Sequence, residues 1–179
     1  MLVKGNTGLV VIDVQGNLAK RVHQSEQMIG NVCKLIQGAQ VLSMPIIWLE
    51  QTPDKLGSSV DSVAQLMTGK TPLAKHTFDA CSNVEFLSQV KAAKVRCWLI
   101  CGIEAHICVY QTAQSMAKLG YYVEVVSDAV SSRKVDNTTL ALNKCALQRI
   151  GLTSVEMSLY EVLGDSTAPE FKSVLAIVK

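Results

Sequence analysis

Residues 7–14 read TGLVVIDV, a run in which four consecutive apolar residues precede a lone aspartate. The apolar residues do not alternate with polar ones, so we expect both faces of this segment to be buried. That pattern is typical of a strand in a parallel sheet that helices cover on both sides. The same character predicts strands over residues 45–50, 73–78, 95–101 and 122–126, and a short one near 150–153.

Helical patterns fill the gaps between these runs. Apolar residues recur at helical spacing over residues 27–42, and Ser82 or Asn83 can cap a helix that continues to Ala93. Further helices are expected over residues 107–119, where Gly120 supplies the stop, and over 137–150 and 169–178. Strands that alternate with helices predict an α/β three-layer sandwich with a mostly parallel, roughly six-stranded, Rossmann-like sheet. A chain of 179 residues fits a single domain over residues 1–179.

The composition excludes several classes of protein. Hydrophobic residues make up 49% of the chain, which excludes disorder, and charged residues only 18%, against about 25% in a usual soluble protein. This low charge suggests surface buried against other subunits, so we expect a homo-oligomer, a dimer or a higher assembly. The net charge is +2 without a long basic run, so we expect no nucleic-acid partner. The apolar runs are too short to span a bilayer, so we expect no membrane partner.

The six cysteines indicate a compartment. No secretory leader pattern precedes the first strand, so we expect a cytoplasmic protein whose thiols stay reduced. The cysteines form no CxxC pair, which disfavours a zinc ribbon. We interpret most of them as small buried apolar residues, with room for one reactive thiol among them.

Ligands of an open α/β sheet bind at the carboxyl ends of its strands, and three predicted strand ends carry polar side chains. Asp13 follows four apolar residues, and its alternative role is to cap the next turn. Lys75 lies in a mostly apolar stretch, where an ordinary lysine extending toward water is the alternative. Cys108 follows a glycine-containing strand end in the first turn of a helix, which would lower its pKa. Its alternative is a buried structural cysteine.

Together, a carboxylate, an ammonium and a thiol at one sheet edge predict a nucleophilic site. His106 is the other candidate base, but residues two apart on a helix do not face each other. We therefore interpret His106 as a residue of the substrate pocket or of the packing. Phe78 is a candidate wall of the same pocket, with core packing as its alternative.

Four segments resemble the isochorismatase-like cysteine hydrolase superfamily, which includes nicotinamidases and N-carbamoylsarcosine amidases. They read LVVIDVQ (residues 9–15), KHTFDA (75–80), GIEAHICVYQTA (102–113) and GYYVEVVSDAVSSR (120–133), and the resemblance extends from about Leu9 to Gly164. It implies a catalytic triad of Asp13, Lys75 and Cys108 and a cis peptide bond between Ile103 and Glu104. It also implies an oxyanion hole made by the backbone N–H groups of Glu104 and Cys108. We expect the substrate pocket to contain Gln15, Gln51, Phe78 and His106.

Two departures from this superfamily limit the activity that can be carried over. Nicotinamidases hold a metal through an Asp-x-His pair after the second strand, but residues 48–55 read WLEQTPDK and contain no histidine. We therefore predict no metal and no cofactor. Isochorismatase itself lacks the nucleophilic cysteine, so Cys108 favours hydrolysis of a C–N bond in a small-molecule substrate. The alternatives are a catalytically silent binding or interaction protein on the same scaffold, and a redox-sensing thiol partnered by Cys81 or Cys101.

Overall fold

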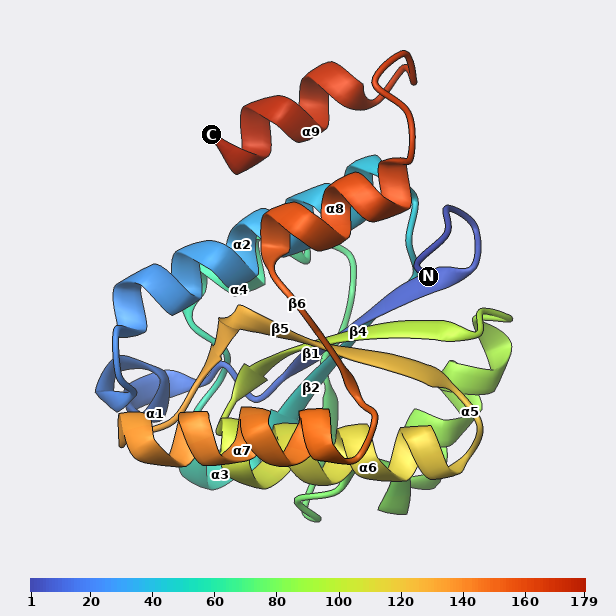
Figure 1. Ribbon diagram of the computed structural model, residues 1–179. Coiled ribbons are helices and arrows are strands. Elements are labelled where there is room, and N and C mark those ends of the chain that lie inside the picture. Colours follow the sequence, from blue (N-terminus) through green and yellow to red (C-terminus); the bar gives the residue numbers. More distant parts are fainter.

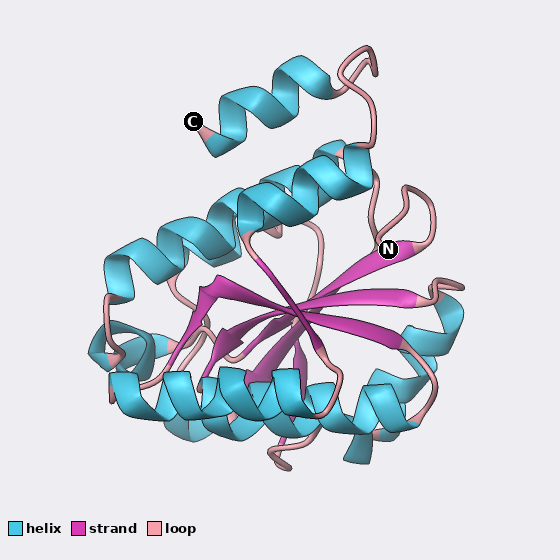
Figure 2. Ribbon diagram, in the orientation of Figure 1, coloured by secondary structure: helices cyan, strands magenta, loops and turns pink.

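The computed structural model describes residues 1–179 and contains one six-stranded sheet in which every paired strand is parallel. The strand order is β3-β2-β1-β4-β5-β6. The strands are β1 (Thr7–Ile12), β2 (Ile46–Gln51), β3 (Leu73–Lys75), β4 (Cys97–Ile103), β5 (Tyr122–Ser131) and β6 (Gly151–Thr153). The predicted three-layer α/β architecture is confirmed, and Figure 2 shows the strands between two layers of helices.

Nine α-helices and two short helical turns connect the strands. They are α1 (Gly16–Arg21), α2 (Ser25–Val41), α3 (Pro53–Leu56), α4 (Asp61–Leu66), α5 (Val84–Ala92), α6 (Tyr110–Lys118), α7 (Val135–Leu147), α8 (Val155–Leu163) and α9 (Phe171–Val178), with the 3₁₀ turn η1 (Ala80–Ser82) and the π-helical turn η2 (Ala105–Val109). In Figure 1, α2, α4 and α8 cover one face of the sheet, and α5, α6 and α7 cover the other. Helix α9 packs on α2 and α8.

The first strand shows why its sequence specifies a doubly covered sheet. Leu9 and Val11 belong to the core on the α2 and α8 side, whereas Val10 and Ile12 belong to the core on the α5 and α6 side. All four side chains are fully buried. Because alternate residues of a strand point to opposite faces, an unbroken apolar run is what a strand covered on both faces requires.

Several predicted boundaries differ from the observed ones. Strand β5 extends to Ser131. Its pairing with β4 is irregular between Ile100 and Gly102, and it then continues with Gly102 opposite Val130 and Ile103 opposite Ser131. Helices α1, α3 and α4 were not predicted, since each has six residues or fewer and lacks a usable apolar repeat. Helix α8 was also missed, although the Ser154 side chain accepts a hydrogen bond from Met157 N and Gly164 ends the helix in the left-handed region.

No helix of the protein combines the length and the apolar character that crossing a membrane would need.

Candidate functional site

Asp13 follows the last residue of β1 at the carboxyl edge of the sheet. Its φ angle is +53°, its N–H donates to Leu49 O over 3.2 Å, and the residue is only 2% exposed. Beside it, Gly102 has a φ of +112°, and a Cβ at that position would lie 1.9 Å from Ile12 O. Only glycine therefore allows β4 to approach β1 this closely where the aspartate emerges.

Lys75 ends β3 and is 1% exposed. Its Nζ donates to Asp13 Oδ2 over 2.7 Å, to Gln51 Oε1 over 2.6 Å and to Thr77 O over 3.3 Å. All three ammonium protons thus have acceptors, which is how a fully buried charge becomes tolerable. The parallel pairing of Gln51 with Lys75 in β2 and β3 brings the amide to the ammonium. The other carboxylate oxygen, Asp13 Oδ1, is buried without a hydrogen-bond partner.

Cys108 lies in η2, directly after the sheet edge, and is 6% exposed. The peptide bond between Ile103 and Glu104, which leads into this turn, is cis. The expectation of a lowered thiol pKa is wrong. Burial, together with the negative charge of Asp13, raises the pKa of Cys108 to about 12, and the charge of Lys75 only partly opposes this. The resting thiol is therefore protonated at neutral pH.

The carboxyl group of Asp13 is shifted by the same surroundings. Burial raises the pKa of Asp13 from its ordinary value of 3.8, while the charge of Lys75, its hydrogen bond and the neighbouring Cys108 thiol lower it. Burial has the larger effect, so the carboxylate is a stronger base than an exposed aspartate would be. A protonated thiol thus lies against a carboxylate of raised basicity.

Glu104 lies at the start of the turn and is held from two directions. Its carboxylate accepts from Arg133 N over 2.9 Å and from Arg133 Nε over 3.1 and 3.2 Å. Its carbonyl oxygen accepts from the N–H groups of Ile107 and Val109, over 3.0 and 3.4 Å. The backbone N–H of Glu104 itself donates to no protein acceptor. The turn that carries Cys108 is therefore fixed in place while one amide at its start stays free.

A cavity of about 90 Å³ opens above the thiol. Its lining residues come from four segments of the chain: Asp13, Leu18, Gln51, Leu56, Phe78, Ile103, Glu104, Ile107 and Cys108. The sequence predicted Asp13, Gln51, Phe78, Glu104 and Cys108 at the site, and the structure brings these five to one cavity. The aliphatic walls Leu18 and Leu56 were missed because they belong to α1 and α3, which were not predicted.

The model of the family described as "Isochorismatase domain" matches residues 7–157. The chain belongs to the isochorismatase family. A relative in Phytophthora sojae, the "secreted isochorismatase effector Isc1", is 30% identical over 99% of this chain and 87% of its own length. Proteins of the isochorismatase family are generally hydrolases.

Solved structures share the fold of this isochorismatase-family protein. The "MAR1 ribonuclease" of Caenorhabditis elegans superposes with a TM-score of 0.93 at 32% identity, over 99% of this chain and 91% of that one. The YcaC gene product of Escherichia coli, described as an octameric hydrolase of unknown specificity, gives a TM-score of 0.89 at 21% identity over 99% and 86%. The second likeness shows the fold alone.

Two predicted pocket residues of the isochorismatase-family protein do not line the cavity. The Gln15 side chain is fully buried, exchanges hydrogen bonds with the backbone of Gln51 and donates to Gly57 O over 2.7 Å. It therefore ties the segment carrying Leu56 to the sheet.

His106 is the second of these residues, and it contacts Ser132 Oγ through Nδ1 over 2.9 Å and Asn137 Nδ2 through Nε2 over 3.2 Å. His106 therefore joins the turn after β4 to Ser132 and to α7 and does not line the cavity with Cys108.

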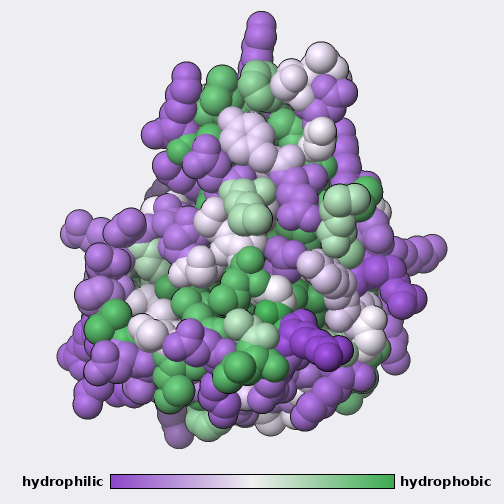
Figure 3. Space-filling model, viewed as in Figure 1, coloured by the Kyte–Doolittle hydropathy of each residue, from purple (hydrophilic) through white to green (hydrophobic).

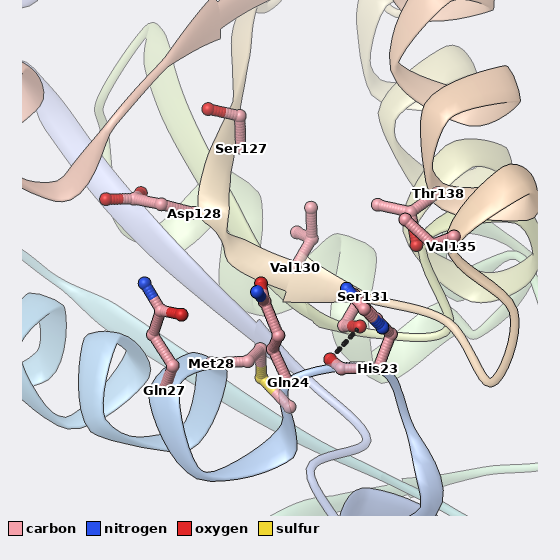
Figure 4. Close-up of a pocket in the computed structure, with 10 residues that line it drawn as sticks. All are labelled: His23, Gln24, Gln27, Met28, Ser127, Asp128, Val130, Ser131, Val135 and Thr138. Carbon is pink, nitrogen blue, oxygen red and sulfur yellow. Dashed lines mark hydrogen bonds between the residues drawn. The ribbon is translucent and has the colours of Figure 1, made fainter.

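A second, more polar pocket of about 200 Å³ lies farther along the same sheet edge (Figure 4). Gln24 and Gln27 extend into it from the start of α2, and Ser131 Oγ donates to His23 O over 2.7 Å (Figure 4). This pocket contains none of Asp13, Lys75 and Cys108. No group of three or more histidine, cysteine, aspartate or glutamate side chains in the protein could hold a metal ion.

Proposed function

We propose that the protein is a cofactor-free cysteine hydrolase that cleaves an amide-type C–N bond in a small molecule. The observation that carries this proposal is that Cys108 and Asp13 line one cavity while the two carboxylate oxygens of Asp13 differ in their surroundings. Asp13 Oδ2 is held by Lys75, whereas Oδ1 has no partner and is free to accept a proton. This is the arrangement of a nucleophile, a base and a group that orients the base.

The proposed reaction balances its atoms with these residues and one water molecule. Cys108 Sγ attacks the amide carbonyl carbon while its proton passes to Asp13 Oδ1. Because the thiol is protonated at rest, attack and proton transfer occur together rather than through a preformed thiolate. Asp13 then gives the proton to the leaving nitrogen, the C–N bond breaks and a Cys108 thioester remains. Water, deprotonated by Asp13, hydrolyses the thioester to a carboxylic acid and restores the thiol.

The oxyanion of each tetrahedral intermediate needs donors near Cys108. We assign this role to the backbone N–H groups of Glu104 and Cys108, and the free amide of Glu104 supports the assignment. Arg133 is a positioning residue for this hole, because its three hydrogen bonds hold the Glu104 side chain. Loss of one oxyanion donor typically costs about 3 kcal/mol of transition-state stabilisation.

The proposal is tested with wild-type protein, Cys108→Ala and the control Cys145→Ala, which removes another buried cysteine outside the cavity. Each is incubated with a panel of small amides, ammonia release is measured, and acyl adducts are sought by intact-mass spectrometry. We expect turnover and a Cys108 adduct in the wild type and in Cys145→Ala only. If no amide is hydrolysed and no adduct forms, a silent binding protein on this scaffold becomes the better interpretation.

Ribonuclease activity is a second candidate, because the C. elegans neighbour at 32% identity is described as a ribonuclease. The net charge of +2 and the cavity of about 90 Å³ support the small-molecule proposal instead. Incubation with a mixed RNA substrate separates the two. RNA cleavage that Cys108→Ala abolishes would replace the amidase proposal.

We also propose that the protein is a cytoplasmic homo-oligomer. All six cysteines are free, which supports a reducing compartment. The exposed apolar side chains Leu140, Leu147, Leu152 and Met157 lie on α7, β6 and α8 at one edge of the sheet. Figure 3 shows apolar surface on the face where Figure 1 places α7 and β6. Light scattering coupled to size exclusion tests this proposal, and a monomer at micromolar concentration would contradict it.

A further inference from the structure

The cavity above Cys108 is small, and its walls are hydrocarbon. We infer that it accepts a short, uncharged, unfunctionalised acyl group of no more than about four carbons, so that the substrates are compact aliphatic amides. This inference rests on the proposed function and specifies its substrate class. Three observations support it: the size of the cavity, the occupation of its polar atoms, and the charges that face it.

The size excludes large acyl groups. The cavity measures about 90 Å³, well below the roughly 300–1,000 Å³ of sites for drug-sized ligands. Leu18, Leu56, Ile103 and Ile107 supply its aliphatic walls. Phe78, which is 54% exposed, marks the side open to solvent. The acyl chain therefore enters the closed apolar end, and the leaving amine departs past Phe78.

The polar atoms of the cavity are almost all engaged within the protein. Gln51 gives Oε1 to Lys75 and donates through Nε2 to His76 O over 2.7 Å. Both oxygens of Glu104 accept from Arg133. Asp13 Oδ1, the Cys108 thiol and the backbone N–H of Glu104 are left, and the proposed reaction uses all three. A hydroxyl or amide on the acyl chain would be buried there without a hydrogen-bond partner, which is unfavourable.

The charges disfavour an anionic acyl group as well. The two carboxylates of Asp13 and Glu104 line the cavity, whereas the cations that compensate them, Lys75 and Arg133, do not. A carboxylate on the substrate would face both negative groups in a largely apolar space. Anionic compounds are therefore poor candidates for this site.

The first experiment measures kcat/KM for ammonia release from straight-chain amides between acetamide and octanamide. We expect a maximum at propanamide or butanamide and a fall of about tenfold for each methylene beyond. Two analogues of butanamide replace its terminal methyl group. We expect 3-hydroxypropanamide to be about 100-fold poorer and succinamate to be poorer still. Equal or better turnover of hexanamide or succinamate would overturn the inference while leaving the proposed hydrolase intact.

The second experiment widens the cavity. Leu56→Ala should move the optimum toward pentanamide and hexanamide, whereas Leu66→Ala, a comparable half-buried leucine of α4 outside the cavity, should leave the chain-length profile unchanged. An unchanged profile in Leu56→Ala, with turnover retained, would also overturn the inference. If wild-type protein hydrolyses no amide and forms no Cys108 adduct, the proposed function itself fails.

Discussion

Two pockets at the carboxyl edge of the sheet differ in the surroundings of their carboxylates. Asp13, which lines the cavity above Cys108, has one carboxylate oxygen 2.7 Å from the buried ammonium of Lys75 and the other without a partner. In the pocket of Figure 4, the only carboxylate is that of Asp128, which accepts from Val155 N over 2.9 Å and joins β5 to α8. The larger pocket thus contains exposed polar groups, and the smaller one contains a thiol and a buried carboxylate oxygen that has no hydrogen-bond partner.

This difference shows that volume alone is a poor guide to chemistry in this protein. The Figure 4 pocket is the roomier of the two, at about 200 Å³ against about 90 Å³. However, it offers no thiol and no buried carboxylate, because its acidic residue Asp128 and its histidine His23 are both exposed. Perturbed pKa values in a cleft mark functional sites more specifically than size does, and here both Asp13 and Cys108 are shifted.

Removal of the nucleophile should give the largest effect. We expect Cys108→Ala to lower kcat/KM for butanamide by at least about 10⁴-fold, because no other group can form the thioester. The control Cys145→Ala deletes a buried sulfur from the core near α7 and should retain activity. Ammonia release measures both. Equal loss of activity in the two variants would indicate disrupted folding rather than loss of a nucleophile.

Breaking the buried ion pair should give the second largest effect, on stability. Lys75→Met leaves the Asp13 carboxylate buried and uncompensated, so we expect the free energy of unfolding to fall by about 3–5 kcal/mol. The control is Lys4→Met, which removes the exposed partner of Glu170 and should change stability little. Urea denaturation measures both variants. Because Asp13→Asn removes the unpaired charge, the double variant Asp13→Asn with Lys75→Met should regain part of the loss.

The sequence was sufficient to predict the sheet and the proximity of Asp13 to Lys75 and Cys108. Unbroken apolar runs predicted the strands, since residues 9–12 supply both cores, and the polar groups that end them predicted Asp13 and Lys75. It was insufficient for the parts that depend on tertiary contacts. Leu18 and Leu56 lie on helices of six and four residues, which tertiary packing stabilises more than local propensity does.

The orientation of the side chains in the turn after β4 could not be predicted from the sequence either. The sequence predicts a helix over residues 107–119 and leaves His106 either in the pocket or in the packing, whereas the observed turn begins at Ala105, is π-helical, and has His106 bonded to Ser132 and Asn137. The thiol pKa was assigned the wrong direction for a related reason. A helix N-terminus alone would lower it, but the burial of Cys108 beside Asp13 is a tertiary property and has the larger effect.

The pH dependence should report the raised pKa of Asp13. The base must be ionised, so kcat/KM for butanamide should fall about tenfold per pH unit below that pKa, which lies above 3.8. Stability should move in the opposite sense. Between 3.8 and the raised value the folded state binds more protons than the unfolded state, so this contribution to stability declines as pH rises. Asp13→Asn should lack that decline, and an acid limb at or below 3.8 would contradict the assignment.

The smallest expected change in kcat/KM comes from replacing a glutamine, and each of the two pockets contains one that can be replaced. Gln51→Leu removes the neutral acceptor 2.6 Å from Lys75 Nζ but keeps the ion pair with Asp13, so we expect about a tenfold loss of kcat/KM. Gln27→Leu alters an exposed residue of the Figure 4 pocket and should leave kcat/KM within about twofold of wild type. Steady-state kinetics with butanamide measures both. A larger loss in Gln27→Leu than in Gln51→Leu would place the chemistry in the polar pocket. In that case the Gln27 side chain would contact the substrate, and the Gln51 side chain, which is bound to Lys75, would not.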